Sequence, residues 1–328
     1  MTEPEIWPLF SVIIPTRNRA GLFAVALQSV LDQRFRRFEV IVVDDGSAEP
    51  DALQYAVLAG KAPVPVQVLR LQPTQRGHGP GYATNHGASH ALGDYLCFLD
   101  DDDQWVDADH LARVAGVIAA AARPPDLILA NQHAYRDGVL VEQVVWIEGL
   151  MDRLISKPDP AGAYTVGPEE LLSCPAHCHL NTTIVLRNFF TEIGGFDQEL
   201  RYEQDRDFYL RAIDRAHCIK YLPCVVSRHN IPDPAAHASV STAESALSKR
   251  LYQLRVLDKA ALFSRRSALR RYAMRHRAYA LAHIAAEARL IGQTDSAAYY
   301  RCESLVARLS AAWPRKLLKT SAGQCRAM

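Results

Sequence analysis

Four consecutive aspartates, Asp100 to Asp103, follow directly after an apolar run from Tyr95 to Leu99. An apolar run of this length is typical of a strand that is covered on both faces of a sheet. Carboxylates placed side by side repel one another unless a cation or strong hydrogen-bond donors lie beside them. Mg²⁺ and Mn²⁺ prefer oxygen ligands and would suit such a cluster. The alternative is an acidic loop that caps the helix expected from Asp107, because aspartate favours helix caps and first turns.

Polar residues also follow two other apolar runs. Ser11 to Pro15 predicts a short strand that leads into Thr16 to Arg19, and Phe38 to Val43 predicts a second strand that ends in Asp44 and Asp45. Stretches with helical spacing separate these strands. This alternation predicts a parallel sheet with helices on both faces. Because ligands bind such sheets outside the carboxyl ends of the strands, we expect the three polar strand ends to form one site on one rim.

The other elements are predicted from apolar spacing and from glycine, proline and polar breaks. Helices are expected over residues 22–31, from a cap at Ser47 towards Gly60, over 82–92 and over 107–122. Further strands are expected at 66–71, 126–130, 139–147, 179–187 and 219–222. Residues 149–170 carry no regular pattern and suit a loop over an acceptor site.

Three blocks resemble the nucleotide-sugar half of family 2 glycosyltransferases: Phe10 to Arg19, Phe38 to Ser47 and Gly93 to Asp103. Three blocks in matching order and spacing are far more specific than a lone Asp-x-Asp motif. The resemblance, over residues 9–230, implies the GT-A fold, which is α/β and Rossmann-like, with a mainly parallel sheet flanked by helices. The expected glycosyltransferase domain is 1–240, with a nucleotide-sugar-binding half at 9–130 and an acceptor and catalytic-base half at 131–240. Residues 241–328 are expected to form a helical appendix.

The resemblance also implies roles for the residues at the strand ends. Asp45, with Asp44 beside it, would contact the nucleotide base, and Asp102 would lie at the ribose and the metal. The donor-site residues expected on this basis are Pro15, Thr16, Arg19, Asp44, Asp45, Asn85, Asp100, Asp101 and Asp102. The expected ligands of Mn²⁺ or Mg²⁺ are Asp102, Asp103 and His229, with Asp100 as an alternative to Asp103. The alternative for His229 is a structural role, which is commoner for a single histidine.

One position in this half departs from the family pattern. Asn85 ends the triplet Ala83-Thr84-Asn85, where the family usually has Ala-Arg-Asn. Thr84 therefore removes a diphosphate contact from this position unless Arg76 supplies it.

The family places its catalytic base after a Gly-Gly-Phe-Asp segment, found here at residues 194–197. Asp205 then follows Gln204 at the expected start of a helix, and we predict that Asp205 is the base. A carboxylate at a helix N-terminus stays ionised and can take the proton of an acceptor hydroxyl. Glu203 is the candidate replacement for the acid that Gln204 lacks, and Asp207 is expected to position Arg211 or the loop. The alternative is that these carboxylates are ordinary first-turn acids of the helix.

Composition sets further bounds. The 328 residues are 49% hydrophobic and 22% charged with a net charge of +1, which suits a globular protein and gives no global field for nucleic acid. The N-terminus lacks the pattern of a signal peptide, and no apolar run is long enough for a membrane span, so we expect a cytoplasmic location. The cluster of Cys174, His177, Cys178 and His179 lacks a second Cys/His pair at finger-like spacing, which argues against zinc.

The C-terminal region is basic, with 16 Lys and Arg against 4 Asp and Glu between Leu247 and Thr320. Helices are expected over 247–290 and 296–318, separated at Gly292. The arginines at 265, 266, 270, 271, 275 and 277 would form either a solvated helix face or a peripheral contact with anionic lipid at the inner face of the membrane.

The sequence therefore predicts an inverting, metal-dependent glycosyltransferase. Its donor would be a nucleotide-diphospho-sugar, with UDP favoured, and its acceptor a hydroxyl of a glycan, a polysaccharide or a lipid-linked sugar; a homo-oligomer is compatible with the sequence. One alternative is a nucleotidyltransferase on a similar scaffold, although the segment from Thr16 to Arg19 lacks the glycines of its usual loop. The other is a non-catalytic nucleotide-sugar-binding module, which would need no base at Asp205.

Overall fold

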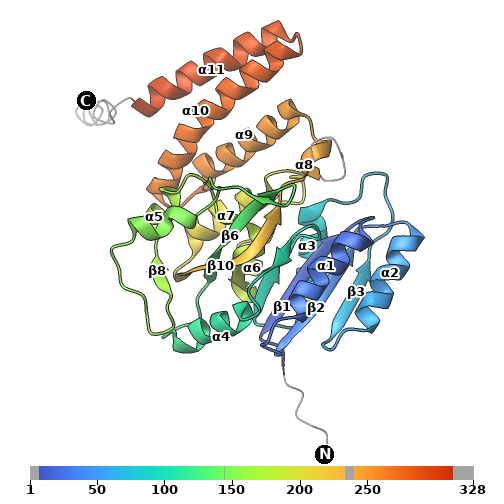
Figure 1. The fold of residues 1–328 in the computed structure, drawn as a ribbon. Coiled ribbons are helices and arrows are strands. Elements are labelled where there is room, and N and C mark those ends of the chain that lie inside the picture. The colour runs from blue at the N-terminus through green and yellow to red at the C-terminus, as the bar shows by residue number, and fades with distance from the viewer. Residues whose placement is uncertain (1–6, 144, 233–239, 313–328) are drawn as a thin grey trace, which may run out of the picture. The chain divides into compact units, whose positions relative to one another are not determined.

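Two compact units make up the computed structural model, Met1–Ala243 and Glu244–Met328. The structure describes residues 7–143, 145–232 and 240–312. The first unit is built on one ten-stranded sheet with helices on its faces (Figure 1), and the second unit consists of helices.

The N-terminal part of the sheet is parallel, as predicted. Its strands lie in the order β3-β2-β1-β4, with bounds Val66–Arg70, Phe38–Asp44, Phe10–Thr16 and Tyr95–Phe98. Helices α1 (Ala20–Leu31), α2 (Glu49–Gly60) and α3 (Pro80–Ser89) connect them. In the register of β1 and β2, Thr16 pairs with Asp44, so both strands end at the same edge.

The rest of the sheet is mixed rather than parallel. β9 (Thr183–Leu186) lies antiparallel between β4 and β6 (Leu127–Arg136), and β10 (Ile219–Asn230) runs parallel to β6. Three short strands pair antiparallel with β6 or β10: β5 (Gln104–Trp105), β7 (Val139–Leu140) and β8 (Tyr164–Val166). Because β9 is reversed, its amino end lies beside the carboxyl end of β4. The short 3₁₀ helix η2 (Leu180–Thr182) at that end therefore meets the aspartate run.

Phenylalanine packing fixes the helix that carries Asp205. α6 (Arg187–Glu192) and α7 (Gln204–Arg215) contribute Phe190 and Phe208, which pack with Phe98 and Phe196 at ring-centroid distances of 4.7–6.5 Å. All four rings are buried. The start of α7 is thus held against β4, the strand that leads into the aspartates.

Some local predictions were wrong. The strand expected over 139–147 is only β7, whose two residues are exposed at an edge. α2 begins at Glu49 with Ala48 as its N-cap, because the proline that follows sets the first turn. Ser47 instead accepts a hydrogen bond from the backbone N–H of Asn18. The helix expected from residue 107 is α4 (His110–Ala120), because Asp107 forms a turn with Asp109. The remaining elements are α5 (Pro168–Leu172), α8 (Val240–Ala243) and the 3₁₀ helix η1 (Glu148–Arg153).

The second unit contains α9 (Ala246–Phe263), α10 (Ser267–Leu290) and α11 (Thr294–Ala312). The single helix predicted over 247–290 is therefore two helices, and the chain turns at Ser264. Arg270 stabilises this turn by donating to the carbonyl groups of Ser264 and Arg265 at 2.5 and 3.0 Å. Gly292 separates α10 from α11 as predicted, at φ +79°. The predicted end of the last helix at 318 lies outside the described residues. Among the helices described, none has an apolar stretch that would cross a bilayer.

Candidate functional site

The three polar strand ends meet on one rim, as predicted. The backbone N–H of Asp45 donates to the carbonyl of Thr16 at 2.9 Å, which joins the ends of β1 and β2. The hydroxyl of Thr16 donates to the buried carboxylate of Asp101 at 2.8 Å, which joins β1 to the aspartate run after β4. Neighbouring Pro15 pairs with Val43 in β2. The side chain of Thr16 thus organises the rim in this structure.

Arg19 lies against two of the four aspartates. Its Nη1 is 2.8 Å from Asp101 Oδ1 and 3.1 Å from Asp102 Oδ2. Burial alone would lower the pKa of Arg19, but the charges of Asp101 and Asp102 outweigh it and raise that pKa. Arg19 therefore remains a cation and neutralises part of the negative charge of the run.

Asp103 is buried and holds His229 in place. Its carboxylate accepts hydrogen bonds from His229 Nδ1 and the backbone N–H of Asn230, both at 2.7 Å, and from the side-chain amide of Asn181. Because His229 Nδ1 donates to this carboxylate, its Nε2 is left to accept a proton or bind a cation. A carboxylate that orients a histidine in this way is common behind metal-ligating histidines.

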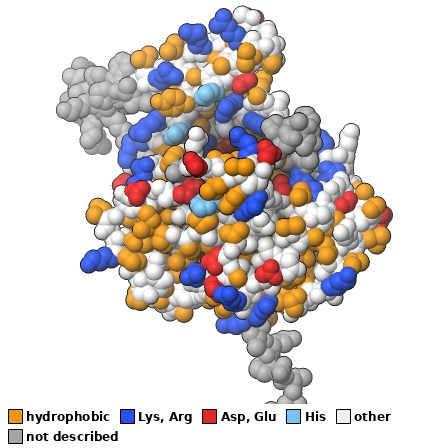
Figure 2. Space-filling view, in the orientation of Figure 1, with side chains coloured by type: hydrophobic (Ala, Val, Ile, Leu, Met, Phe, Trp, Pro, Cys, Tyr) orange, Lys and Arg blue, Asp and Glu red, His pale blue; other side chains and the backbone are white. Residues whose placement is uncertain are grey.

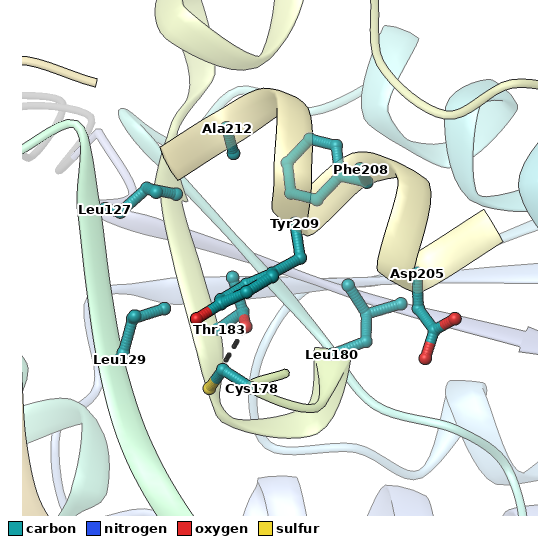
Figure 3. A pocket seen from close by; sticks show the side chains of 9 residues that line it. All are labelled: Leu127, Leu129, Cys178, Leu180, Thr183, Asp205, Phe208, Tyr209 and Ala212. Carbon is teal, nitrogen blue, oxygen red and sulfur yellow. Dashed lines mark hydrogen bonds between the residues drawn. The ribbon is translucent and has the colours of Figure 1, made fainter. Parts of the chain in front are cut away.

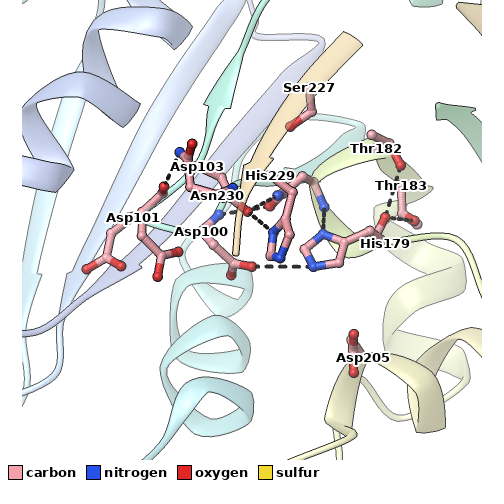
Figure 4. Close-up of polar contacts among 12 residues, drawn as sticks. Asp100, Asp101, Asp103, His179, Thr182, Thr183, Asp205, Ser227, His229 and Asn230 are labelled. Carbon is pink, nitrogen blue, oxygen red and sulfur yellow. Dashed lines mark hydrogen bonds and ion pairs between the residues drawn. The ribbon is translucent and has the colours of Figure 1, made fainter. Parts of the chain in front are cut away.

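A second histidine completes a group that suits a divalent cation. One ligand atom each from Asp103, His179 and His229 lies within 4.8 Å of the others. His179 Nε2 is also 3.9 Å from Asp100 Oδ2, and Figure 4 shows Asp100 directed toward the two imidazole rings. Carboxylate oxygens suit Mn²⁺ and Mg²⁺, and imidazole nitrogens favour a transition metal over Mg²⁺.

The electrostatics of this group also fit a cation. Burial and the neighbouring charges of Asp103 and Asp101 raise the pKa of Asp102 to about 6, and burial with Asp103 and Asp102 raises the pKa of Asp100. Burial lowers the pKa of His179 to about 4, so this ring is neutral at pH 7. The carboxylates thus carry more negative charge than the protein neutralises, and a bound divalent cation would relieve this excess.

Sequence reasoning missed His179, Trp146 and His177. Trp146 is buried, with its ring edge-on to His179 and His229 at centroid distances of 5.5 and 5.3 Å. The only sequence signal was the cluster of cysteines and histidines at 174–179, and here that segment contributes its histidines to two different carboxylates. The cysteines of this cluster are buried, and Cys178 lies 3.2 Å from the hydroxyl of Thr182.

Asp205 lies in the first turn of α7, as predicted. Its Oδ1 accepts from the backbone N–H of Arg206 at 2.8 Å, and its Oδ2 is 3.0 Å from Nε2 of His177. Burial alone would raise the pKa of Asp205, but the charge and hydrogen bond of His177, with smaller contributions from His179 and Arg206, hold it well below the ordinary range. Asp205 is therefore ionised at neutral pH.

Asp205 also lies at the edge of a small pocket (Figure 3). The other residues lining it are Leu127, Leu129, Cys178, Leu180, Thr183, Phe208, Tyr209 and Ala212. This lining is mostly apolar, and the Asp205 carboxylate points away from it in Figure 3, with its side chain 23% exposed.

Neighbouring acids have structural partners. Asp207 Oδ2 accepts from Arg211 Nε at 2.8 Å, and Arg211 also donates to the carbonyls of Ile193 and Gly195, which confirms the predicted pairing. Glu203 has a left-handed backbone with φ +66°, and its carboxylate lies 3.3 Å from Arg206. Glu203 thus supports the start of α7 through an ion pair.

Asn85, Asp44 and Asp45 also make protein contacts. The side-chain amide of Asn85 donates to the carbonyl of Phe196 at 2.8 Å and accepts from its N–H at 2.9 Å, which ties α3 to the segment before α7. A Cβ on Gly195 would lie 2.5 Å from this amide oxygen, so the close approach requires glycine. Asp44 accepts from the N–H of Ser47 at 2.8 Å. The carboxylate of Asp45 accepts hydrogen bonds from the loop before α3.

The fold and the site together define a class of protein. A mostly parallel sheet with carboxylates at its strand ends resembles solved GT-A structures. Staphylococcus aureus TarS 1–349 in complex with UDP-GlcNAc matches with a TM-score of 0.62 at 20% identity, over 84% of this chain and 72% of that one. Mannosyltransferase PcManGT from Pyrobaculum calidifontis, in complex with GDP-Man and Mn²⁺, matches with a TM-score of 0.60 at 17% identity, over 96% and 92%. These likenesses establish a GT-A fold.

Sequence comparisons identify the family. Residues 11–171 match the model of glycosyl transferase family 2. The amylovoran biosynthesis glycosyltransferase AmsB of Erwinia amylovora is 28% identical over 207 residues, which is 62% of this chain and 63% of that protein. A PGL/p-HBAD biosynthesis glycosyltransferase of Mycobacterium tuberculosis is 29% identical over 224 residues, 68% of this chain and 77% of that protein. The segment of residues 11–171, about half of the chain, is therefore a family 2 glycosyltransferase domain. It spans somewhat less than two thirds of the length of AmsB.

Proposed function

We propose that this protein is an inverting, divalent-metal-dependent glycosyltransferase. It would transfer a sugar from a nucleotide-diphospho-sugar, a UDP-sugar in our proposal, to a hydroxyl group in the assembly of a glycan, polysaccharide or glycolipid. The observation that carries the proposal is the ionised carboxylate of Asp205 in the same domain as a carboxylate and histidine cluster suited to a cation. Family membership and the names of the relatives support the same activity.

The proposed metal ligands are Asp102, Asp103 and His229. Among the described residues, the geometry groups Asp103 and His229 with His179 and leaves out Asp102, whose Oδ2 lies 3.1 Å from Arg19 Nη1. A bound divalent cation would supply positive charge that stabilises a nucleotide diphosphate as leaving group. The protein residues around it have separate tasks. Arg19 holds Asp101 and Asp102, and Asp103 fixes the ring of His229.

Asp205 is the proposed base. As the acceptor oxygen attacks the anomeric carbon, Asp205 would take the hydroxyl proton, and the bond from that carbon to the diphosphate would break. A carboxylate with a depressed pKa is ionised before the reaction, so it is ready to accept the proton. His177 and the N–H of Arg206 fix its two oxygens. One base acting without a protein nucleophile corresponds to a single displacement with inversion.

A binding and transfer experiment tests this proposal. Thermal shift with UDP, GDP, dTDP and CMP species, each with and without Mn²⁺, should show a metal-dependent rise in melting temperature for one diphosphate. Asp102→Ala should abolish the shift. Asp205→Asn should keep the shift and lower the transfer rate about 10²- to 10⁴-fold, the usual contribution of a general base. No shift with any nucleotide would contradict the proposed donor site. Unchanged transfer by Asp205→Asn would show that another group is the base, and metal-dependent binding with no sugar transfer by the wild-type protein would favour a nucleotidyltransferase or a binding module.

We also propose that the second unit makes the peripheral membrane contact. The exposed pair Leu262 and Phe263, 73% and 71% exposed, lies at the turn between α9 and α10 and is followed, after Ser264, by Arg265 and Arg266. Apolar side chains beside cationic ones suit an anionic lipid surface. Figure 2 shows basic and apolar side chains interspersed over this unit. The predicted basic face is smaller than expected, because Arg277 Nε pairs with Asp258 at 2.7 Å.

Vesicle sedimentation tests this contact. The protein should co-sediment with vesicles that contain phosphatidylglycerol and should stay in the supernatant with phosphatidylcholine vesicles. The double substitution Leu262→Ser and Phe263→Ser should abolish this co-sedimentation. Leu290→Ser with Ile291→Ser is the matched control, since that exposed pair lies at the other end of α10. Equal loss in both variants would contradict a specific role for the turn between α9 and α10.

A further inference from the structure

The loop before α3 occupies most of the hydrogen-bonding capacity of Asp45. The backbone N–H and the ring Nδ1 of His78 both lie 2.8 Å from Asp45 Oδ1. The backbone N–H of Gly79 donates to Asp45 Oδ2 at 3.0 Å. Because an ionised carboxylate only accepts hydrogen bonds, His78 Nδ1 must carry the proton in this contact.

These donors leave unequal capacity on the two oxygens. A carboxylate offers about four acceptor positions, two on each oxygen. His78 fills both positions on Oδ1, and Gly79 fills one on Oδ2. A further ligand therefore finds room for one donor, on Oδ2. The side chain of Asp45 is 10% exposed, so few other directions of approach are open.

The loop is held in place from several sides. Arg17 Nη2 donates to the carbonyl of Thr74 at 2.9 Å, and Arg201 Nη2 donates to the carbonyl of Arg76 at 2.7 Å. Gly77 has φ +67°, and a Cβ there would lie 2.5 Å from Asp45 Oδ2. The His78 ring stacks on Tyr82 of α3 with a centroid distance of 4.8 Å. These contacts fix the donors on Asp45, so an incoming base meets a carboxylate whose Oδ1 is already filled.

We propose that His78 is a specificity-determining residue that restricts the donor to nucleotides whose base presents a single N–H. This inference rests on the proposed function, in which the base lies against Asp45. Uracil and thymine present one ring N–H between two carbonyl groups, which matches the one open position on Oδ2. Guanine presents a ring N–H and an amino group side by side and pairs best with both carboxylate oxygens at once. With Oδ1 filled by His78, guanine loses one of these two contacts.

Titration calorimetry of the full chain with UDP, dTDP and GDP in the presence of Mn²⁺ tests this inference. We expect UDP and dTDP to bind about 10- to 100-fold more tightly than GDP, the range over which a two-point base contact discriminates. His78→Ala frees a position on Oδ1 and should bring the UDP and GDP affinities to within about 3-fold, less than 1 kcal/mol. His78→Gln keeps a side-chain donor and should retain the preference. His86→Ala is the matched control, because the ring of His86, like that of His78, stacks on Tyr82.

The outcomes separate this inference from the proposed function. If no nucleotide diphosphate binds, the donor-site proposal is wrong and the inference with it. If the wild-type protein binds GDP as tightly as UDP, the donor site stands and the role of His78 is wrong. The role of His78 is also wrong if His78→Ala weakens the binding of UDP and GDP equally. The ratio of the two affinities is then unchanged, and the loss of affinity reports only a loosened loop.

Discussion

Two aspartates from the same run should respond in opposite directions to the loss of their charge. In metal-free protein, Asp103→Asn should lower the free energy of unfolding, whereas Asp102→Asn should raise it. Asp103 is buried with three donors on its carboxylate, from His229, Asn230 and Asn181. An asparagine keeps one acceptor oxygen, so its amino group must face at least one of these donors. A buried unpaired donor and the lost charge-assisted bond together cost about 2–4 kcal/mol.

The magnitude for Asp102 follows from its pKa. That pKa is raised from 3.8 to about 6 in the folded protein. Between these values the unfolded chain loses the proton first, so stability falls as pH rises through this window and stays lower above it. At about 1.4 kcal/mol for each pH unit, the ionised carboxylate destabilises the metal-free fold at pH 7 by up to about 3 kcal/mol. Asparagine removes this cost but also loses the ion pair with Arg19, so the net gain in stability is smaller.

Urea unfolding in EDTA at pH 7 and pH 4 measures both effects. Asp103→Asn should unfold at lower urea at pH 7. Asp102→Asn should show a smaller loss of stability between pH 4 and pH 6 than the wild type, with a remainder from Asp100 and Asp101, whose pKa values are also raised. Mn²⁺ should stabilise the wild-type protein more than Asp102→Asn. A stable Asp103→Asn, or an Asp102→Asn variant less stable than the wild type in EDTA, would refute this account of the site.

Three further substitutions test contacts near the site. His177→Ala should raise the pKa of Asp205, because burial then acts with less opposition, and the acid limb of the pH–rate profile should move to higher pH. Glu203→Gly should leave the transfer rate within about 3-fold but lower stability by about 1–4 kcal/mol in urea unfolding. Glycine relieves the left-handed backbone, but the ion pair that is lost with Arg206 is largely buried, at 10% and 17% exposure. A large fall in the transfer rate would instead show that the Glu203 carboxylate takes part in the reaction. Gly77→Ala should weaken UDP binding at least about 10-fold in calorimetry, because its Cβ would collide with Asp45 and the left-handed backbone costs about 1–2 kcal/mol; unchanged affinity would show that the loop adjusts freely.

The sequence by itself determined the parallel part of the sheet and the meeting of the three polar strand ends. Buried strands and amphipathic helices are local patterns of a few residues, and parallel strands in alternation with helices bring their carboxyl ends to one edge. It also determined the position of Asp205 in the first turn of α7, since helix starts are set by local residues. The roles assigned to the donor and metal residues remain predictions, because binding has to be measured.

Only the tertiary structure decided which side chains face one another. β9 lies antiparallel between β4 and β6, and no local pattern signals that reversal. Its consequence is that His179 lies beside Asp100 and His229, and that His177 reaches Asp205. Each pair joins segments far apart in the chain, so its geometry depends on sheet order and packing. The filled acceptor positions on Asp45 have the same origin, because two arginines and a glycine turn place one loop against the end of β2.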